Sequence, residues 1–147
     1  NSIKIIGEDA GRVQVEAGAG ENWHGLVRWS LEKGLCGLEN LSLIPGSVGA
    51  APIQNIGAYG VEVGTFIESV QCRRLPSGER LQLERDDCEF GYRDSVFKHG
   101  LRDAVLIESV SFRLPLAEAP RFPDANRLFL ERLGAQGARL VEMMKPQ

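Results

Sequence analysis

Leu43-Ile-Pro-Gly-Ser-Val-Gly-Ala-Ala-Pro-Ile-Gln-Asn-Ile-Gly-Ala-Tyr-Gly60 departs furthest of any stretch in this chain from ordinary helix or strand composition. Four glycines and two prolines lie within this segment, here called the central loop, and residues 40–61 carry no charge. Glycine permits positive φ and the close approach of another surface, whereas proline fixes φ and removes a hydrogen-bond donor. The backbone therefore shapes this loop, and its lack of charge indicates that it is buried or pressed against a ligand.

Composition and spacing leave two interpretations of the central loop open. Its glycine-opened N–H groups can cradle phosphate or flavin oxygens, or the loop can be a structural crossover between two lobes. Gly46-Ser-Val-Gly49 lacks the Lys-Ser/Thr of a P-loop, and no Gly-x-Gly-x-x-Gly follows a strand, so neither common nucleotide motif is present. In either case the polar side chains of the loop need partners, namely those of Ser47, Gln54, Asn55 and Tyr59.

The overall composition bounds the class of protein. With 147 residues, 43% of them hydrophobic and 25% charged, the chain has the size of one domain or of part of a two-lobed one. Its net charge of -3 gives no reason to expect nucleic acid or an anionic membrane as partner, and no protein partner is predicted. The cysteines show no disulfide or zinc pattern, which fits a reducing cytoplasm. No segment has the pattern of a signal peptide or membrane helix, so we expect a soluble, cytoplasmic protein.

The first part of the chain predicts a hairpin followed by a helix. Two β-branched runs, residues 3–6 and 12–16, surround a long loop at residues 7–11, and Val13 and Val15 fall on a buried face. Apolar residues then recur at helical spacing, at Trp23, Leu26, Val27 and Leu31. Asn22 is the expected N-cap and Gly34 the expected C-terminal glycine. His24 and Trp29 lie off the apolar stripe, which favours a surface or loop-facing position over a ligand role.

Beyond the central loop the pattern is mainly that of strands. Residues 66–75 and 79–83 flank Pro76-Ser77-Gly78, the turn chemistry of a second hairpin with one solvated face. Residues 104–114 form the strongest strand, and their apolar phase changes near Glu108, which predicts a bulge or a change of partner there. Strands and helices do not alternate regularly, so the fold class predicted is α+β.

A second candidate for chemistry is Phe90-Gly-Tyr-Arg-Asp-Ser-Val-Phe-Lys98. The guanidinium of Arg93 is a permanently charged planar fork, suited to a carboxylate or to developing oxyanion charge. Pattern alone favours the plainer alternative, in which Arg93 pairs with Asp94 or Asp86 at the surface. Ser95 makes a weak nucleophile, because only His99 could activate it and no acid partner is evident for that histidine. A cap or turn hydrogen bond is the favoured role for Ser95.

Three segments carry a resemblance to a known family. Gly37-Leu-Glu-Asn-Leu-Ser-Leu followed by the central segment up to Glu62 resembles the UDP-N-acetylenolpyruvoylglucosamine reductases, also called UDP-N-acetylmuramate dehydrogenases. Residues 90–98 and Gly18-Ala-Gly-Glu-Asn-Trp-His24 resemble the same family. The motifs occur in the family's order and near its spacing, so the likeness runs from about residue 3 to 114. The chain is similar to the form with a Tyr-bearing loop.

The resemblance implies a fold, an activity and a set of site residues. Residues 1–114 would be part of a two-lobed FAD-binding (PCMH-type) domain, mainly its second lobe, with a mostly antiparallel sheet and a few helices. The implied activity is that of an FAD-dependent oxidoreductase acting on a CH-CH bond. It would reduce UDP-N-acetylglucosamine enolpyruvate to UDP-N-acetylmuramate with NADPH as hydride donor, in peptidoglycan synthesis, and so serve cell wall biogenesis, cell shape and the cell cycle.

Carried over position by position, the residues that would line FAD are Ile44, Gly46, Val48, Gly49, Ala50, Ile53 and Gly57. Tyr59 and Tyr92 would contact the UDP-sugar substrate. Arg93 would be both substrate-binding and catalytic, because hydride addition next to a carboxylate places negative charge on its oxygens and a fixed guanidinium stabilises that charge. No metal is implied.

The departures from the family limit these expectations. Its Gly-Gly-Gly-Ser-Asn-type pyrophosphate loop would precede Asn1, and its proton-donating Ser, in a Gly-Ser-Phe-Phe-Lys-Asn-Pro setting, would follow Leu114. Neither motif occurs. Residues 115–147 do not match the family and are expected to form a helical tail, at 125–133 and 138–144. The chain is therefore expected to be a fragment and a poor catalyst alone.

Two other hypotheses remain open. The first is a non-catalytic remnant or a flavin- or ligand-binding module of the same fold. The second, ranked last, is another flavoprotein of this fold with a covalent flavin anchor, because neither His24 nor Cys36 lies in a recognisable anchor setting.

Overall fold

The structure, a computed structural model, describes residues 2–116. Its strands are β1 (Ile3–Asp9), β2 (Arg12–Gly18), β3 (Gly57–Ala58), β4 (Val61–Glu62), β5 (Ile67–Arg74), β6 (Arg80–Glu84) and β7 (Val105–Pro115). The α-helices are α1 (Trp23–Glu32) and α2 (Ala51–Gln54). Short 3-10 helices are η1 (Glu39–Leu41), η2 (Val48–Ala50), η3 (Val63–Thr65), η4 (Arg85–Cys88) and η5 (Val96–Lys98).

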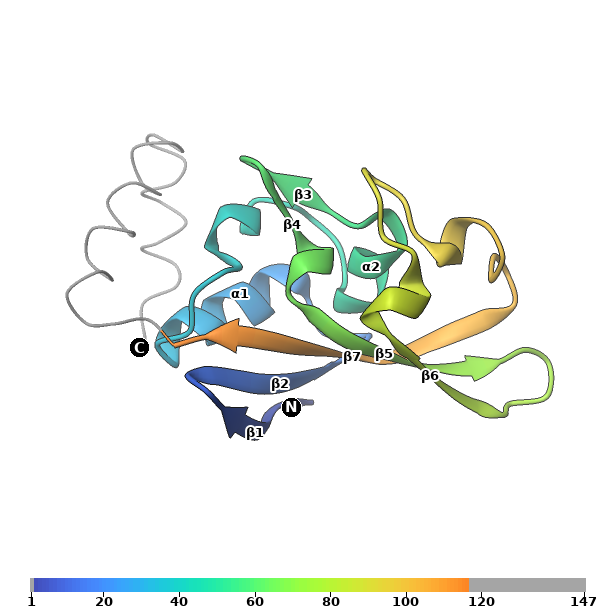
Figure 1. The fold of residues 1–147 in the computed structure, drawn as a ribbon, viewed down its shortest axis with the longest axis horizontal. Coiled ribbons are helices and arrows are strands. Elements are labelled where there is room, and N and C mark those ends of the chain that lie inside the picture. Colours follow the sequence, from blue (N-terminus) through green and yellow to red (C-terminus); the bar gives the residue numbers. More distant parts are fainter. Residues whose placement is uncertain (1, 117–147) are drawn as a thin grey trace.

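An antiparallel sheet of five strands, in the order β1-β2-β7-β5-β6, forms one layer. The helices and the small β3-β4 sheet cover one face of it (Figure 1). This arrangement confirms the expected α+β class with a mostly antiparallel sheet. No helix within residues 2–116 is long and apolar enough to cross a membrane. The predicted helices at 125–133 and 138–144 lie outside the described residues.

The first hairpin is present, but the long loop expected at residues 7–11 is wrong. Strand β1 continues to Asp9, and the connection is a two-residue turn at Ala10 and Gly11 with φ of 53° and 77°. Two consecutive positive φ values give a turn whose twist matches that of paired strands. Because Glu8 and Asp9 are polar they interrupt the apolar pattern, yet their backbones still pair with β2. Val13 and Val15 are buried as expected.

Helix α1 has the boundaries that its capping residues predict. Oδ1 of Asn22 accepts a hydrogen bond from Gly25 N at 3.0 Å, and Gly34 follows the helix with φ of 74°. The ring of Trp23 packs on the sheet, with its centroid 6.0 Å from that of Phe112 in β7. One expectation for this helix is wrong, because Trp29 is partly buried and packs against the core.

Strand β7 lies at the centre of the sheet and contains the predicted bulge. In its pairing with β5, Ser109 lies opposite Gln71 and Ile107 lies opposite Cys72, so Glu108 is an extra residue. On the helix-covered side of β7 the core residues are Val110, Phe112 and Leu114. The side chains on the opposite face are polar, and one example is the Arg73–Glu108 ion pair at 2.8 Å. This polar face confirms the solvated side expected for the second hairpin.

Candidate functional site

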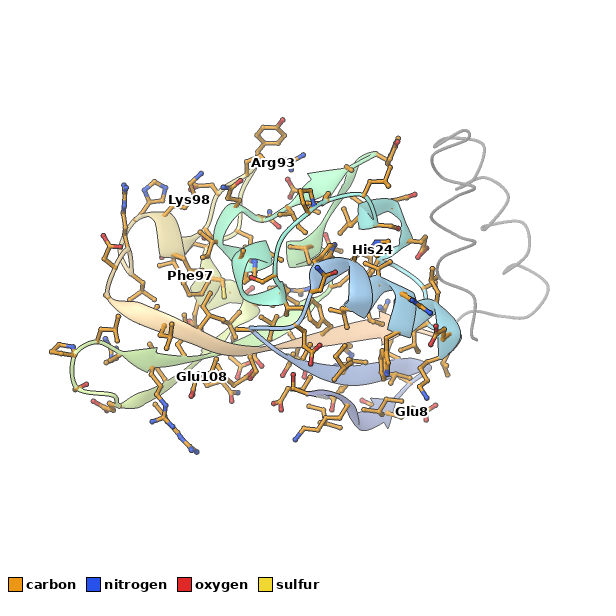
Figure 2. All side chains as sticks on the ribbon, turned by 180° about the vertical axis from the view of Figure 1, so that it is seen from behind. Glu8, His24, Arg93, Phe97, Lys98 and Glu108 are labelled. Atoms are coloured by element: carbon orange, nitrogen blue, oxygen red, sulfur yellow. The ribbon has the colours of Figure 1, made fainter. Side chains whose placement is uncertain are left out.

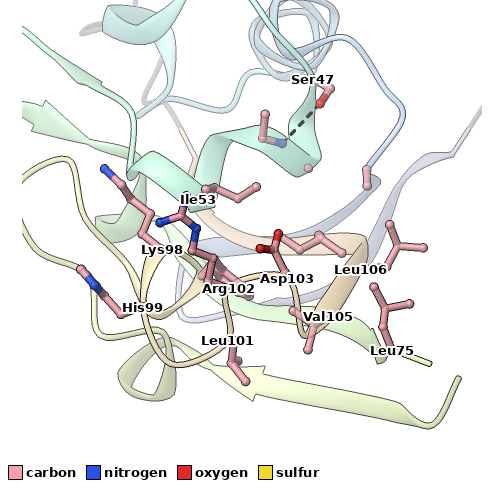
Figure 3. Close-up of a pocket in the computed structure, with 15 residues that line it drawn as sticks. Ser47, Ile53, Leu75, Lys98, His99, Leu101, Arg102, Asp103, Val105 and Leu106 are labelled. Carbon is pink, nitrogen blue, oxygen red and sulfur yellow. Dashed lines mark hydrogen bonds between the residues drawn. The ribbon is translucent and has the colours of Figure 1, made fainter. Parts of the chain in front are cut away.

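A groove of about 930 Å³ runs between the central loop and the start of β7 (Figure 3). The central loop contributes Ser47, Gly49, Ala50 and Ile53 to its lining. The rest of the lining is largely aliphatic, from Leu75, Leu101, Val105, Leu106 and Ile107, with Phe97. Figure 3 shows Lys98 and His99 toward one end and Leu75 and Leu106 toward the other. An apolar groove with a few charged side chains suits a flat aromatic ligand with polar substituents.

The central loop is held by backbone hydrogen bonds to the corner after β2. Val48 N donates to Glu21 O at 2.8 Å, and Gly49 N donates to Ala19 O at 3.0 Å. A Cβ on Gly49 would lie 2.7 Å from that of Ala19, so only glycine allows the two backbones to approach this closely. The N–H group of Ala50 is likewise bonded, to Ser47. These three N–H groups already have hydrogen-bond acceptors within the protein. A ligand at this wall therefore meets side chains and Cα atoms rather than a cradle of free N–H groups.

Arg93 lies on a tight turn and is held over Gly57. Its φ of 49° is left-handed, and the backbones of Gly91 and Asp94 exchange hydrogen bonds across the turn. Nη2 donates to Gly57 O at 2.9 Å, and the ring centroid of Tyr92 lies 4.8 Å from the guanidinium carbon. Nη1 is buried and has no hydrogen-bond partner among residues 2–116. A guanidinium group with an unused donor can form a further charge-assisted hydrogen bond.

The ion-pair partners expected for Arg93 are wrong. Its carboxylate neighbour is Glu62, whose Oε2 lies 3.8 Å from Nη1. Asp94 instead contacts His99, with Oδ1 2.7 Å from Nε2. The left-handed backbone at Arg93 turns its side chain toward the β3-β4 sheet, which a local sequence pattern does not reveal.

Asn55 and Glu62 are members of this site that the sequence interpretation did not assign. Asn55 is 1% exposed and has φ of 47°. Its Nδ2 donates to Glu62 Oε1 at 3.1 Å and to Gly91 O at 2.8 Å, and its Oδ1 accepts from Gly64 N at 2.8 Å. The signal for both was available, because Asn55 is a polar residue within the uncharged run and Glu62 is the first charge after it.

Ser95 has the capping role that was expected for it. Its Oγ accepts from Phe97 N at 3.2 Å and donates to Ile53 O at 2.6 Å, which ties residues 90–98 to the central loop. The expectation that His99 lacks an acid partner is wrong, since Asp94 supplies one. Ser95 nevertheless does not look like a nucleophile, because its hydrogen bonds are made with the backbone groups of Ile53 and Phe97 and not with His99.

The residues expected to line FAD divide into separate groups. Gly49, Ala50 and Ile53 line the groove. Ile44 packs against the core, Val48 is fully buried, Gly46 has φ of 123° and Gly57 lies beneath Arg93. The structure thus brings three of the seven to the groove and one to the arginine. The groove residues from 97 to 107 were not assigned from the sequence.

The two tyrosines expected to contact substrate are exposed, and each lies in a turn of its own. Tyr59 lies in the turn between β3 and β4 with φ of 53° and is half exposed. Tyr92 is 81% exposed beside Arg93. Figure 2 shows Arg93 projecting on the side of the molecule opposite Glu8 of β1, with Lys98 nearby. Nζ of Lys98, which lines the groove, donates to Arg93 O at 3.0 Å, so the backbone of Arg93 lies next to a groove residue.

Two cysteine thiols can be set aside as nucleophiles. Burial raises the pKa of Cys72 to about 11 and that of Cys88 to about 12. Both side chains therefore remain neutral near pH 7, and a neutral thiol is a poor nucleophile. Within residues 2–116 no group of three or more His, Cys, Asp and Glu side chains is arranged to hold a metal ion.

Known proteins resemble this chain in sequence and in fold. Residues 2–84 match the family described as FAD binding domain. The chain is 53% identical over 122 residues to a UDP-N-acetylenolpyruvoylglucosamine reductase of Burkholderia pseudomallei (strain 1710b), covering 83% of this chain and 35% of the relative. The reductase of Burkholderia cenocepacia (strain HI2424) is 52% identical over 123 residues, covering 84% of this chain and 35% of the relative.

The crystal structure of UDP-N-acetylenolpyruvylglucosamine reductase from Thermus caldophilus has a similar fold, with a TM-score of 0.67 and 25% identity. The match covers 80% of this chain and 42% of that one. The chain spans about a third of the length of the curated relatives it matches. By its matched residues the chain belongs to the FAD-binding domain family, and within that family it resembles the UDP-N-acetylenolpyruvoylglucosamine reductases.

Proposed function

We propose that this chain supplies the groove and arginine side of an FAD-dependent reductase of UDP-N-acetylglucosamine enolpyruvate. The product is UDP-N-acetylmuramate, NADPH is the hydride donor, and the protein acts in cytoplasmic peptidoglycan synthesis. The observation that carries the proposal is the aliphatic groove walled by Gly49, Ala50 and Ile53, whose Lys98 is bonded to the backbone of Arg93, an arginine with a buried Nη1 that has no hydrogen-bond partner among residues 2–116. The similarity to reductases of that name supports the substrate.

The residues of the groove suit FAD. Gly49 and Ala50 present little more than backbone, so a flat ring can approach them closely, and Ile53 and Val105 offer aliphatic contacts. Lys98 and Arg102 at the groove offer positive charge to phosphate or ring oxygens. When bound, FAD supplies the two-electron redox chemistry that NADPH drives.

Arg93 binds and stabilises the substrate carboxylate in this proposal. Its two terminal nitrogens differ in their hydrogen bonds: Nη2 donates to Gly57 O, whereas Nη1 has no hydrogen-bond partner among residues 2–116. As negative charge grows on the carboxylate during reduction, a guanidinium already fixed in place stabilises the transition state more than the ground state. Tyr92 and Tyr59 flank the substrate as aromatic contacts.

Titration with FAD tests the proposal. We expect quenching of flavin fluorescence by the purified chain and weaker binding by Ile53→Asp, which places a charge in the groove. Ile5→Asp is the matched control, since Ile5 is exposed on β1 away from the groove. Absence of quenching at high FAD concentration would favour a non-catalytic module of the same fold. Turnover of the enolpyruvyl substrate at an ordinary enzymatic rate by this chain alone would contradict its expected status as part of the enzyme.

A further inference from the structure

Glu62 lies beside Arg93 without occupying its buried donor. The Oε2 to Nη1 distance of 3.8 Å is too long for a hydrogen bond, whereas Oε1 accepts from Asn55 Nδ2 at 3.1 Å. Nη1 consequently keeps its hydrogens without a partner among the described residues. A carboxylate in direct two-pronged contact would fill the guanidinium fork. At the observed distance Glu62 attracts the guanidinium without filling its fork.

Asn55 fixes Glu62 in turn. Its buried amide binds one oxygen of Glu62, the Gly91 carbonyl and the Gly64 N–H group, so it joins β4 to the turn that carries Arg93. The position of the Glu62 carboxylate is therefore set by a buried side chain rather than by its own exposed contacts. The negative charge and the guanidinium belong to two segments that Asn55 holds in register.

Gly57 sets the remaining constraint on the guanidinium. A Cβ at this position would lie 2.5 Å from Nη1 and 3.1 Å from the guanidinium carbon, so the group lies directly against the glycine backbone. Nη2 donates to Gly57 O on one side of the guanidinium. The attraction between Nη1 and Glu62 acts on the other side.

We infer that Glu62 is a positioning residue for Arg93, which holds the guanidinium plane against Gly57 in the orientation in which it meets an incoming carboxylate. The nature of that ligand rests on the proposed function, whereas the placement of the guanidinium does not. Glu62→Gln separates charge from connectivity, because the glutamine oxygen can still accept the Asn55 hydrogen bond while the negative charge is lost.

Nitrogen-15 relaxation of the Arg93 Nε–Hε group tests the placement directly. In the wild-type chain we expect a high order parameter for this group, and a clearly lower one in Glu62→Gln. Glu68→Gln is the matched control, because Glu68 also pairs with an arginine, Arg113, at 3.4 Å on the outer face of the sheet. The control should leave the Arg93 signal unchanged.

A double-mutant cycle tests the consequence for binding. Arg93→Lys retains the charge and loses the planar fork, so it should weaken binding of the enolpyruvyl UDP-sugar in the wild-type background. In the Glu62→Gln background, the loss of affinity caused by Arg93→Lys should be smaller by at least about twofold. A guanidinium that is not held in place has little advantage over the point charge of lysine. General repulsion between the Glu62 carboxylate and the anionic ligand cancels in this cycle, because arginine and lysine at position 93 are both cationic.

The possible results are distinguishable. If the wild-type chain does not bind the enolpyruvyl UDP-sugar, the proposed function fails and the relaxation experiment alone decides the inference. Loss of Arg93 order in Glu62→Gln, together with coupling in the cycle, supports the positioning role. An Arg93 group that stays equally rigid in Glu62→Gln, or a cycle without coupling, overturns it.

Discussion

Gly49→Ala is expected to destabilise the domain, although alanine is the smallest possible addition. The new Cβ would lie 2.7 Å from Ala19 Cβ and 3.2 Å from Ala19 O. Carbon atoms in favourable contact lie about 3.5–4.0 Å apart, so the two backbones must separate by roughly 1 Å. That movement strains the Gly49–Ala19 and Val48–Glu21 hydrogen bonds, each worth about 1 kcal/mol net.

We expect the free energy of unfolding to fall by about 1–3 kcal/mol, the usual cost of overpacking. Urea denaturation followed by tryptophan fluorescence measures it, and the dependence on urea should keep its slope. Gly25→Ala is the matched control, because the nearest atom to its Cβ would be 3.8 Å away and the site lies within α1. The control should gain about 0.5–1 kcal/mol. A Gly49→Ala variant as stable as the wild type, with a normal control, would refute the reasoning.

Asn55→Ala removes three hydrogen bonds from a buried side chain, so the unfolding free energy should fall by about 2–3 kcal/mol in urea denaturation; an unchanged midpoint would contradict this role. Asn22→Ala removes the cap of α1 and should cost about 1 kcal/mol in the same assay, with Asn22→Ser restoring most of it. Because the pKa values of Cys72 and Cys88 are raised on folding, the unfolded chain loses protons first, and stability should fall as the pH rises from 9.0 toward about 11. The fall should reach at most about 1.4 kcal/mol per pH unit for each thiol, and Cys88→Ala should lessen it; an equal slope in that variant would exclude Cys88 as a cause.

Much of the fold could be predicted because its signals are local. The cap at Asn22, the turn at Pro76-Ser77-Gly78 and the phase change at Glu108 each reside in a few neighbouring residues, and all three are present. The first hairpin was misjudged in length because Glu8 and Asp9 are polar, and strand pairing depends on backbone groups rather than on side-chain polarity.

The candidate site was predictable in its segments but not in its contacts. The central loop and residues 90–98 stand out by composition, and the structure joins them through Ser95 and Asn55. Which carboxylate faces Arg93 depends on left-handed backbone at that residue and on a pairing across β4, and neither is encoded within a short window. From the sequence, Gly49 was expected to let FAD approach the backbone. In the structure it is the close packing against Ala19 that requires a glycine at this position.

The extra residue in β7 has an effect beyond its own strand. The carbonyl of Glu108 accepts a hydrogen bond from Ala19 N at 2.8 Å, and Ala19 O accepts one from Gly49 N. The bulge thus begins a relay of backbone contacts that ends at the groove wall. The bulge also separates two parts of β7 with different roles. Val110 and Phe112, after it, pack in the core, whereas Val105, before it, lines the groove. Deleting Glu108 would restore a regular pairing with β5 and leave the inward and outward sides of β7 unchanged, but it would remove the anchor of the wall that faces it.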